Sequence, residues 1–304
     1  MSRAIIVDEF GGPEHLRVRE VPEPHAGSGE VRVRVRTVGL NPIDWKLVSS
    51  PEAAAFFGVS LPTGFGADFA GVVDEVGAGV TGYAPGDRVF GNAGGRAAAD
   101  FVVVAPGQDI LERTPDGLND EVAASLPIPA RTAAAVLDAL DLRDTDTLLV
   151  GGAAGGVGVL LVQLARRAGA RVIGTGSEAT APFLRELGAE PVAYGDGLEE
   201  RIRSIAPEVP AAADLHDADA AQAAVRIGVP AGRIVTIAAA PPEGGIAASS
   251  GSARPDALAS IAAAVAAGEL TVPIAGRYGI DEIQQAVEAQ RAGHVHGKLV
   301  VTIG

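Results

Sequence analysis

Along the first 120 or so residues, short runs of β-branched residues alternate with turns rich in Gly, Pro and Asn. Such runs predict strands, here at residues 4–10, 16–22, 30–40, 69–77, 87–92 and 97–105. Between Val31 and Thr37 valine and arginine alternate, which places the valines on one face of a strand and the arginines on the other. We interpret the arginine face as solvent-exposed, with a nucleic-acid-binding face as the alternative.

From about Glu121 the pattern changes to helices alternating with strands. The sequence pattern predicts helices at 120–140, around a proline, and at 156–169 and 181–189. It predicts strands at 147–152, 171–176, 191–195 and 232–239. The Ala-rich run 211–224 is helix-prone, and 241–255 has a loop composition. Helices at 256–270 and 281–294, an extended segment at 271–279 and a strand at 297–303 follow. The alternation predicts a parallel, doubly wound sheet.

A glycine pattern follows the predicted strand 147–152 and opens the next helix, in the stretch LVGGAAGGVGVLLV. Gly152, Gly155 and Gly158 occur at spacings of three. In this context the pattern indicates dinucleotide binding, because the bare turn lets the main chain and the helix N-terminus approach a pyrophosphate. A plain strand-to-helix connection is the alternative. The expected cofactor-binding residues of this turn are Gly152, Ala154, Gly155, Gly156, Val157 and Gly158.

The end of the following strand bears on the choice of cofactor. An NAD site commonly carries Asp or Glu there to bind the ribose 2′-hydroxyl, whereas this strand ends in Thr175, Gly176 and Ser177, with Glu178 one or two positions late. Absence of a carboxylate removes repulsion of a 2′-phosphate, to which Ser177 can donate. We therefore predict NADPH rather than NADH, with Thr175 and Ser177 in the cofactor site together with Ile237 and Ala238.

Composition excludes several classes of function. Hydrophobic residues make up 47%, a globular value, and no run has the length of a membrane span. The net charge of −14, from 24 basic and 38 acidic residues, disfavours nucleic acid and anionic lipid as partners. Cysteine is absent, which excludes disulfides, thiolate zinc sites and a Cys nucleophile. We expect a cytosolic protein.

Several motifs in order resemble the zinc-independent quinone oxidoreductases of the medium-chain dehydrogenase/reductase superfamily. They are FGGPEHLRVREVPEP (10–24), VGLNPIDWKL (38–47), GADFAGVVDEVGAGVTGYAPGDRVFG (66–91), SLPIPARTAAAVLDAL (125–140), the AAGGVG turn and GHVHGKLVVTI (293–303). The resemblance implies an α/β protein in which a GroES-like β-barrel catalytic domain, residues 1–122 and 250–304, holds a doubly wound, parallel-sheet Rossmann domain, residues 123–249.

The resemblance also implies individual roles. Thr132 is expected to contact the cofactor, and Tyr194 to hold the adenosine 2′-phosphate. The alternatives are a helix N-cap for Thr132 and an ordinary half-buried loop aromatic for Tyr194. A homodimer, formed through edge strands of the Rossmann sheets, is implied as well.

Two departures from the superfamily pattern are informative. Zinc alcohol dehydrogenases carry GHE where this chain has Gly66, Ala67 and Asp68, and they use cysteines that this chain lacks, so no metal site is expected. His216 and Asp217 stand where relatives have a Gly pair, and the chain between Gly232 and Pro255 is short. The floor of the cofactor site is therefore expected to differ.

Without zinc, hydrogen-bond donors must stabilise the oxygen of the acceptor. Asn41, Trp45 and Lys46 supply such donors in NPIDWK, and Asp44 either anchors that turn or pairs with Lys46. The resemblance implies that Asn41 and Asp44 line the nicotinamide end of the site. Asp68 either hydrogen-bonds near the acceptor or caps a turn. The resemblance implies that Lys298 returns to the barrel near the cleft, with a surface lysine as the alternative that we favour.

The leading hypothesis is an NADPH-dependent reductase of quinones or α,β-unsaturated carbonyl compounds. A delocalised enolate or hydroquinone oxyanion needs less electrophilic help than a simple alkoxide, which suits a cleft without metal. One alternative is a carbonyl or enoyl reductase of a dedicated biosynthetic pathway. The other is a catalytically idle NADPH-binding sensor.

Overall fold

The computed structural model describes residues 1–304 and separates them into two compact units. The terminal unit contains both chain ends and comprises residues 1–128, 262–267 and 273–304. The central unit comprises residues 129–261 and 268–272. The expected boundaries, after residues 122 and 249, lie earlier in the chain than the ends of these segments at residues 128 and 261. A β-rich unit interrupted by an α/β unit confirms the fold class read from the sequence.

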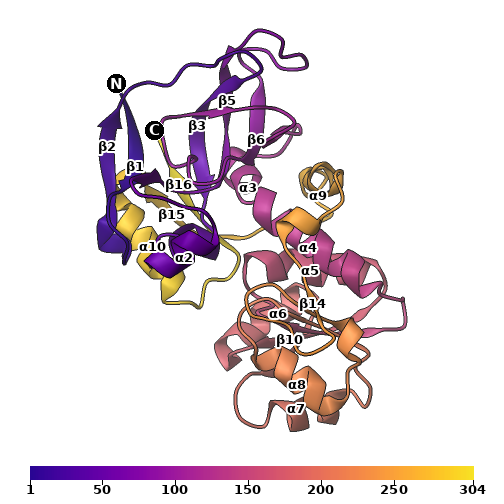
Figure 1. The fold of residues 1–304 in the computed structure, drawn as a ribbon. Helices are drawn as coiled ribbons and strands as arrows, with labels where there is room; N and C mark the ends of the chain where they lie inside the picture. Colours follow the sequence, from indigo (N-terminus) through magenta and orange to yellow (C-terminus); the bar gives the residue numbers. More distant parts are fainter. The chain divides into compact units, whose positions relative to one another are not determined.

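Two sheets form the terminal unit. The smaller has the strand order β2-β1-β4, and the larger has the order β15-β16-β3-β5-β6-β8, with β7 also paired to β3; β3, β5 and β6 lie side by side in Figure 1. The strands are β1 (Ser2–Val7), β2 (Leu16–Val21), β3 (Val31–Gly39), β4 (Thr63–Gly64), β5 (Asp68–Val76), β6 (Arg88–Asn92), β7 (Phe101–Val104), β8 (Ile110–Arg113), β15 (Ile274–Gly279) and β16 (Lys298–Thr302). Strand β16 brings the end of the chain against β3, antiparallel, with Val300 opposite Gly39.

Short helices complete this unit. They are α1 (Pro42–Lys46), α2 (Pro51–Phe56), α3 (Asp120–Ala124) and α10 (Ile283–Arg291), with the 3-10 helices η1 (Pro13–His15) and η5 (Ile280–Glu282). Helix α1 begins one residue after Asn41, and Pro42 at its first position leaves no N–H unsatisfied there. Only Leu40 and the N-cap residue Asn41 therefore separate the end of β3 from the start of α1.

The valine face of β3 is buried as predicted, since Val31, Val33 and Val35 are at most 3% exposed. The arginine face is only partly exposed. Arg32 is 6% exposed and forms ion pairs with Glu23, Asp74 and Glu75. Its guanidinium also lies 4.7 Å from the centre of the Phe101 ring. The prediction of a solvated arginine face is therefore wrong for Arg32, because neighbouring acids and an aromatic ring cover it.

The central unit is built on a six-stranded parallel sheet with the order β11-β10-β9-β12-β13-β14. This order reverses direction beside β9, between β10 and β12, which is the switch point of a doubly wound fold. The strands are β9 (Thr147–Gly151), β10 (Arg171–Gly176), β11 (Glu190–Ala193), β12 (Ala211–Asp214), β13 (Ile234–Thr236) and β14 (Ile246–Ala247).

Helices precede, connect and follow these strands. They are α4 (Pro127–Leu140), α5 (Gly156–Arg167), α6 (Ala181–Glu186), α7 (Leu198–Ile205), α8 (Asp219–Ile227) and α9 (Ala257–Ala266), with the 3-10 helices η2 (Glu178–Thr180), η3 (Ala231–Arg233) and η4 (Ser250–Ser252); several are marked in Figure 1. The proline-interrupted helix expected at 120–140 is confirmed as α3 followed by α4.

The Ala-rich run 211–224 differs from its prediction. Residues 211–214 form β12, and only the part from Asp219 onward is helical, as α8. Ala211, Ala212 and Ala213 are at most 1% exposed in the middle of the sheet. Burial between strands β9 and β13 overrides their intrinsic helix propensity.

Candidate functional site

The glycine turn between β9 and α5 has a different requirement at each glycine. Gly152 has φ +70°, a left-handed conformation that favours glycine. A Cβ on Gly158 would collide with the backbone of Gly152 and Ala153, so α5 lies directly against the end of β9. A Cβ on Gly155 would meet only the Gly152 carbonyl oxygen, at 3.4 Å. Gly152 and Gly158 are thus needed by the fold itself, whereas the space beside Gly155 is open.

That open space fits a pyrophosphate. Gly155 is the N-cap of the 12-residue helix α5 and offers no side-chain cap. The first N–H groups of the helix, at Gly156, Val157 and Gly158, have no intrahelical acceptor and lie at the positive end of the helix dipole. Ala154, Gly155, Gly156 and Val157 are all partly exposed. These main-chain groups are the ones that would hold the diphosphate of a dinucleotide.

Apart from Thr132, the other expected cofactor residues lie at the ends of neighbouring strands of the same sheet. Because the strands are parallel, their carboxyl ends share one edge, where doubly wound folds bind ligands. This edge carries the glycine turn after β9 and, from the adjoining strands, Thr175, Ser177, Tyr194, Ile237 and Ala238.

At the end of β10 the Ser177 hydroxyl has a local partner. Ser177 is the N-cap of η2: its Oγ accepts from the Thr180 N–H at 3.3 Å and lies 2.9 Å from Thr180 Oγ1. Thr175 is buried, and Glu178 is exposed at the start of η2. No basic side chain lies between residues 175 and 180.

After β11, a guanidinium that sequence reasoning missed fixes the backbone around Tyr194. Arg201 of α7 donates to the carbonyl oxygens of residues 193, 194, 195 and 196 at 2.7–3.2 Å. The Tyr194 ring is 53% exposed, so it is an exposed rather than a half-buried loop aromatic. The sequence offers no signal for this contact, because Arg201 is one of many arginines in polar helical segments.

After β12, the carboxylate of Asp214 organises the chain. Asp214 is fully buried and accepts the N–H groups of His216, Asp217 and Ala221 at 3.0–3.2 Å. The His216 Cβ lies beside Gly152, 3.1 Å from where a Cβ would be. His216, which stands where relatives of the superfamily have a glycine, therefore lies next to the glycine turn.

Thr132 lies inside α4, five residues after the helix begins, and is 4% exposed. The N-cap alternative for Thr132 is therefore wrong. Its contact with a cofactor stays a prediction.

The residues predicted to face the acceptor gather in the terminal unit around a buried polar cluster. Asn41 and Asp44 form a capping box at the start of α1, in which the Asn41 N–H donates to Asp44 Oδ2 at 2.8 Å. This confirms that Asp44 anchors the turn, and it forms no pair with Lys46. The Asn41 side-chain amide donates to Asp68 Oδ2 at 2.8 Å and to the Gly39 carbonyl at 3.2 Å.

Asp68, the first residue of β5, is the acceptor at the centre of this cluster. It is fully buried, and its two oxygens also accept from the Asn92 side chain at 2.8 Å and from the Ile128 N–H at 3.0 Å. These bonds join β5, β6 and the start of α4. Asp68 thus does more than cap a turn.

Lys298 completes the cluster, and its interpretation as a surface lysine is wrong. The side chain is 3% exposed, and its ammonium donates to the Leu40 carbonyl and to Asn41 Oδ1, both at 2.7 Å. The pairing of β16 with β3 brings Lys298 to this position from the far end of the chain. The resemblance places Lys298 near the cleft, but its burial has no signal in the local sequence, since a single lysine before a strand is ordinarily solvated.

Burial shifts the proton affinities of all three charged groups. Desolvation raises the pKa of Asp44 to about 7, helped by repulsion from Asp68 and opposed by the N–H of Asn41. Desolvation likewise raises the pKa of Asp68, while the charge of Lys298 opposes the rise. Burial lowers the pKa of Lys298 to about 8 against the attraction of Asp68 and Asp44. Burial therefore favours the neutral form of each of these three groups.

Of the three donors expected in NPIDWK, two are engaged inside the protein. Asn41 uses its amide as described, and Trp45 donates its indole N–H to Gln290 Oε1 at 3.1 Å. Lys46 is exposed, and its ammonium lies 5.8 Å from the centre of the Trp45 ring without an ion pair. Lys46 alone keeps its donors available.

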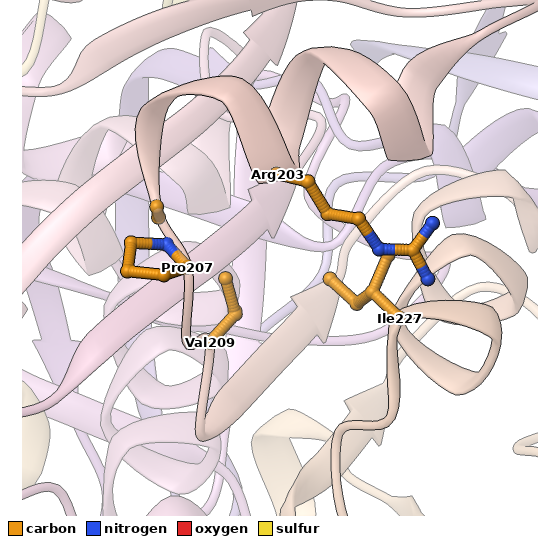
Figure 2. Close-up of a pocket in the computed structure, with 5 residues that line it drawn as sticks. Arg203, Pro207, Val209 and Ile227 are labelled. Carbon is orange, nitrogen blue, oxygen red and sulfur yellow. The ribbon is translucent and has the colours of Figure 1, made fainter.

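A hollow of about 280 Å³ lies elsewhere in the central unit. Figure 2 shows Arg203, Pro207, Val209 and Ile227 around it, at the ends of α7 and α8 and the approach to β12. It is thus at the amino end of β12, whereas the glycine turn lies at the carboxyl end of the neighbouring strand. It contains none of the predicted site residues.

Side chains able to ligate a metal do not gather in groups of three or more anywhere in the structure. No helix combines the length and the apolar character needed to cross a membrane.

Two family models match the chain. Residues 27–108 match the alcohol dehydrogenase GroES-like domain, and residues 187–301 match the model described as zinc-binding dehydrogenase. The first lies in the terminal unit, and the second runs from the central unit into the terminal one.

Curated relatives include quinone oxidoreductases. The chain is 36% identical to that of Mus musculus over 198 residues, which are 63% of this chain and 58% of the mouse protein. It is 37% identical to that of Pseudomonas aeruginosa over 192 residues, 62% of this chain and 57% of the relative. The chain thus matches little more than half the length of these relatives. A 166-residue stretch, 54% of the chain, is also 41% identical to 4% of the erythronolide synthase EryA2 of Saccharopolyspora erythraea.

Solved structures match over the whole chain. The quinone oxidoreductase of Coxiella burnetii has a TM-score of 0.87 at 28% identity, covering 100% of this chain and 99% of its own. A mycobacterial protein solved in complex with NADPH has a TM-score of 0.88 at 27% identity, covering 100% of both chains.

Proposed function

Because this chain belongs to the quinone oxidoreductase family of the medium-chain dehydrogenase/reductase superfamily, we propose that it is an NADPH-dependent oxidoreductase. Its proposed substrates are quinones or α,β-unsaturated carbonyl compounds, reduced without zinc. When bound, a reduced nicotinamide would supply the hydride. The chain's own residues bind that cofactor and stabilise the oxygen of the acceptor.

The glycine turn is the observation that carries the proposal. Space is open beside Gly155, and the free N–H groups of α5 lie at the edge where the carboxyl ends of the six parallel strands meet. We propose that residues 154–158 hold the diphosphate, with Thr132, Ile237 and Ala238 contacting the rest of the cofactor. Binding of NADPH to the purified protein, measured by fluorescence or calorimetry, tests this directly.

The residues at the superfamily's zinc position support a metal-free reaction. Ala67 cannot ligate a metal, and Asp68 spends both oxygens on three hydrogen-bond donors. The chain also lacks cysteine. Activity that survives prolonged dialysis against a chelator is the expected outcome, whereas loss on chelation and recovery with Zn²⁺ would overturn this part of the proposal.

Lys46 is the donor that we propose for the acceptor oxygen. Asn41 and Trp45 have their donors engaged, while the Lys46 ammonium is exposed and unpaired. A delocalised enolate or hydroquinone oxyanion can be stabilised by few donors. Lys46→Met should therefore slow NADPH oxidation, and an unchanged rate would dispose of this role.

The preference for NADPH rests on the edge near β10 and β11. No acidic residue ends β10 at positions 175–177, and Tyr194 lies exposed on a loop held by Arg201. The mycobacterial neighbour with NADPH supports the same choice. Dissociation constants for NADPH and NADH are the test: equal values would contradict the proposed role of Ser177.

A second candidate is an enoyl or carbonyl reductase of a biosynthetic pathway. The 41% identity to a segment of a polyketide synthase favours it. A panel of quinones, enones, thioester enoyl compounds and aldehydes, with NADPH consumption as the readout, separates the candidates by their relative kcat/KM. Tight NADPH binding without turnover of any compound would instead favour the idle sensor.

We also propose a homodimer, as the resemblance implies. Strand β14 lies at the edge of the central sheet and is paired on one side only, so a second copy can continue the sheet. Light scattering of the purified protein tests the expected mass. The cytosolic location stays a prediction from composition.

A further inference from the structure

Lysine is rare in this chain. Of its 24 basic residues 22 are arginine, and only Lys46 and Lys298 are lysine. One of these two is the buried amine of the polar cluster, at 3% exposure. An ammonium is a compact point charge with three donors, whereas a guanidinium is a broad planar fork. The position of Lys298 thus takes the smaller cation in a protein whose other basic residues, apart from Lys46, are all arginines.

The two bonds of the Lys298 ammonium both act on the entry to α1. One reaches the Leu40 carbonyl, just before the helix, and the other reaches Asn41 Oδ1, on the N-cap residue. A cation at Asn41 Oδ1 leaves only one orientation for the amide, in which Nδ2 faces Asp68 and the Gly39 carbonyl. Lys298 therefore decides how the N-cap residue of α1 is held.

Charge balance gives Lys298 a second effect. Asp44 and Asp68 are both buried, and Lys298 is the one cation in the cluster. A buried carboxylate without a cation is costly and tends to take up a proton. A protonated Asp68 would itself become a donor, so one of the two side-chain amides that donate to it, that of Asn41 or that of Asn92, would have to reorient.

We propose that Lys298 is a positioning residue for the reductase reaction: by fixing the Asn41 amide and offsetting the charge of Asp68, it holds the start of α1 so that Lys46, at the end of this five-residue helix, faces the acceptor in one arrangement. The inference rests on the proposed function. It assigns no contact between Lys298 and substrate.

Kinetics of four variants test the proposal. Lys298→Met should lower kcat at least tenfold while the dissociation constant of NADPH changes less than twofold. Asp68→Asn removes the charge that Lys298 offsets and keeps one oxygen for the Asn41 amide, so the double variant Lys298→Met with Asp68→Asn should regain part of the lost kcat. Val300→Ala, a truncation of a fully buried residue two positions along the same strand, is the matched control and should keep the wild-type kcat.

The double variant separates positioning from mere support of the fold. A purely structural role would make the two losses add, whereas the proposed charge balance makes the loss in the double variant smaller than in Lys298→Met alone. Wild-type kcat in Lys298→Met, or a double variant no better than Lys298→Met alone, would overturn the proposal.

A second measurement needs no acceptor and no folded Lys298 variant. Labelling with ¹³Cε-lysine gives only two side-chain signals in the wild-type protein, and Lys46→Arg identifies which is which. Titration should show the pKa of Lys298 lowered from the ordinary value of a lysine side chain, because burial disfavours its charged form. A Lys298 amine that titrates at the ordinary value of a lysine side chain would overturn the buried pairing. Absence of turnover in the wild type, with the lowered pKa of Lys298 intact, would instead count against the proposed function alone.

Discussion

Gly158 lies directly against the carbonyl oxygen of Gly152, so that a methyl group on Gly158 would collide with the backbone of the turn. Gly155, three residues earlier, has open space around the same position. The two glycines of one pattern therefore serve different purposes, since Gly158 allows α5 to pack and Gly155 leaves room for a ligand.

Alanine substitutions at these two positions should separate folding from binding. Gly158→Ala is expected to destabilise the protein by about 1–3 kcal/mol, because the helix must move away from β9. Gly155→Ala, at φ −76°, should change the free energy of unfolding little but weaken NADPH binding roughly tenfold, about 1.4 kcal/mol. Urea unfolding and cofactor titration measure the two effects. Unchanged NADPH affinity in Gly155→Ala would contradict a diphosphate at this turn.

Asp44 should make the stability depend on pH between about 4 and 7. Its pKa rises on folding from 3.8 to about 7, so the folded protein keeps a proton that the unfolded chain releases in this range. The contribution of neutral Asp44 to the free energy of unfolding is therefore complete below pH 4 and is lost as the pH rises through 7.

Asp44→Asn removes this titration while keeping an oxygen for the Asn41 N–H. We expect the free energy of unfolding of the variant, relative to wild type, to increase steadily from pH 4 to 8. Denaturant melts across this range measure it. A constant difference at all pH values would show that Asp44 titrates normally in the folded state.

Arg201 should influence cofactor preference without touching a phosphate. It holds four successive carbonyls of the loop that carries Tyr194. Arg201→Met frees this loop, and we expect the affinity for NADPH to fall severalfold more than that for NADH. Arg203→Met on the same helix is the control, since Arg203 donates only to the Arg226 carbonyl. Equal losses for both cofactors would argue against a 2′-phosphate site at Tyr194.

Arg32 should matter for stability in proportion to its burial. Removing it leaves Asp74 and Glu75 without their shared buried partner, and we expect Arg32→Met to cost about 1–3 kcal/mol. Arg34 has a side chain 58% exposed, shares Asp74 and the Phe101 ring, and Arg34→Met should cost below about 1 kcal/mol. Chemical denaturation of the two variants tests the order, and equal losses would contradict it.

Local pattern was sufficient for the central unit wherever the signal lay within one strand-turn-helix segment. The glycine spacing after an apolar run predicted the turn, and parallel strands then placed Ser177 and Tyr194 on the same edge. The same reasoning failed at Ala211–Asp214, because alanine carries little β preference and only its place inside the sheet makes it a strand.

The sequence by itself determined the two kinds of sheet, the glycine turn and the absence of thiol ligands, because these depend on residue type and short spacing. Only the tertiary structure decided that Lys298 is buried against Asn41, that Arg201 holds the Tyr194 loop, and that Asn41 and Trp45 spend their donors internally. Each of these follows from contacts between distant segments or from the exact direction of a long side chain. Such contacts form when strands such as β16 and β3 pair, and no local pattern records them.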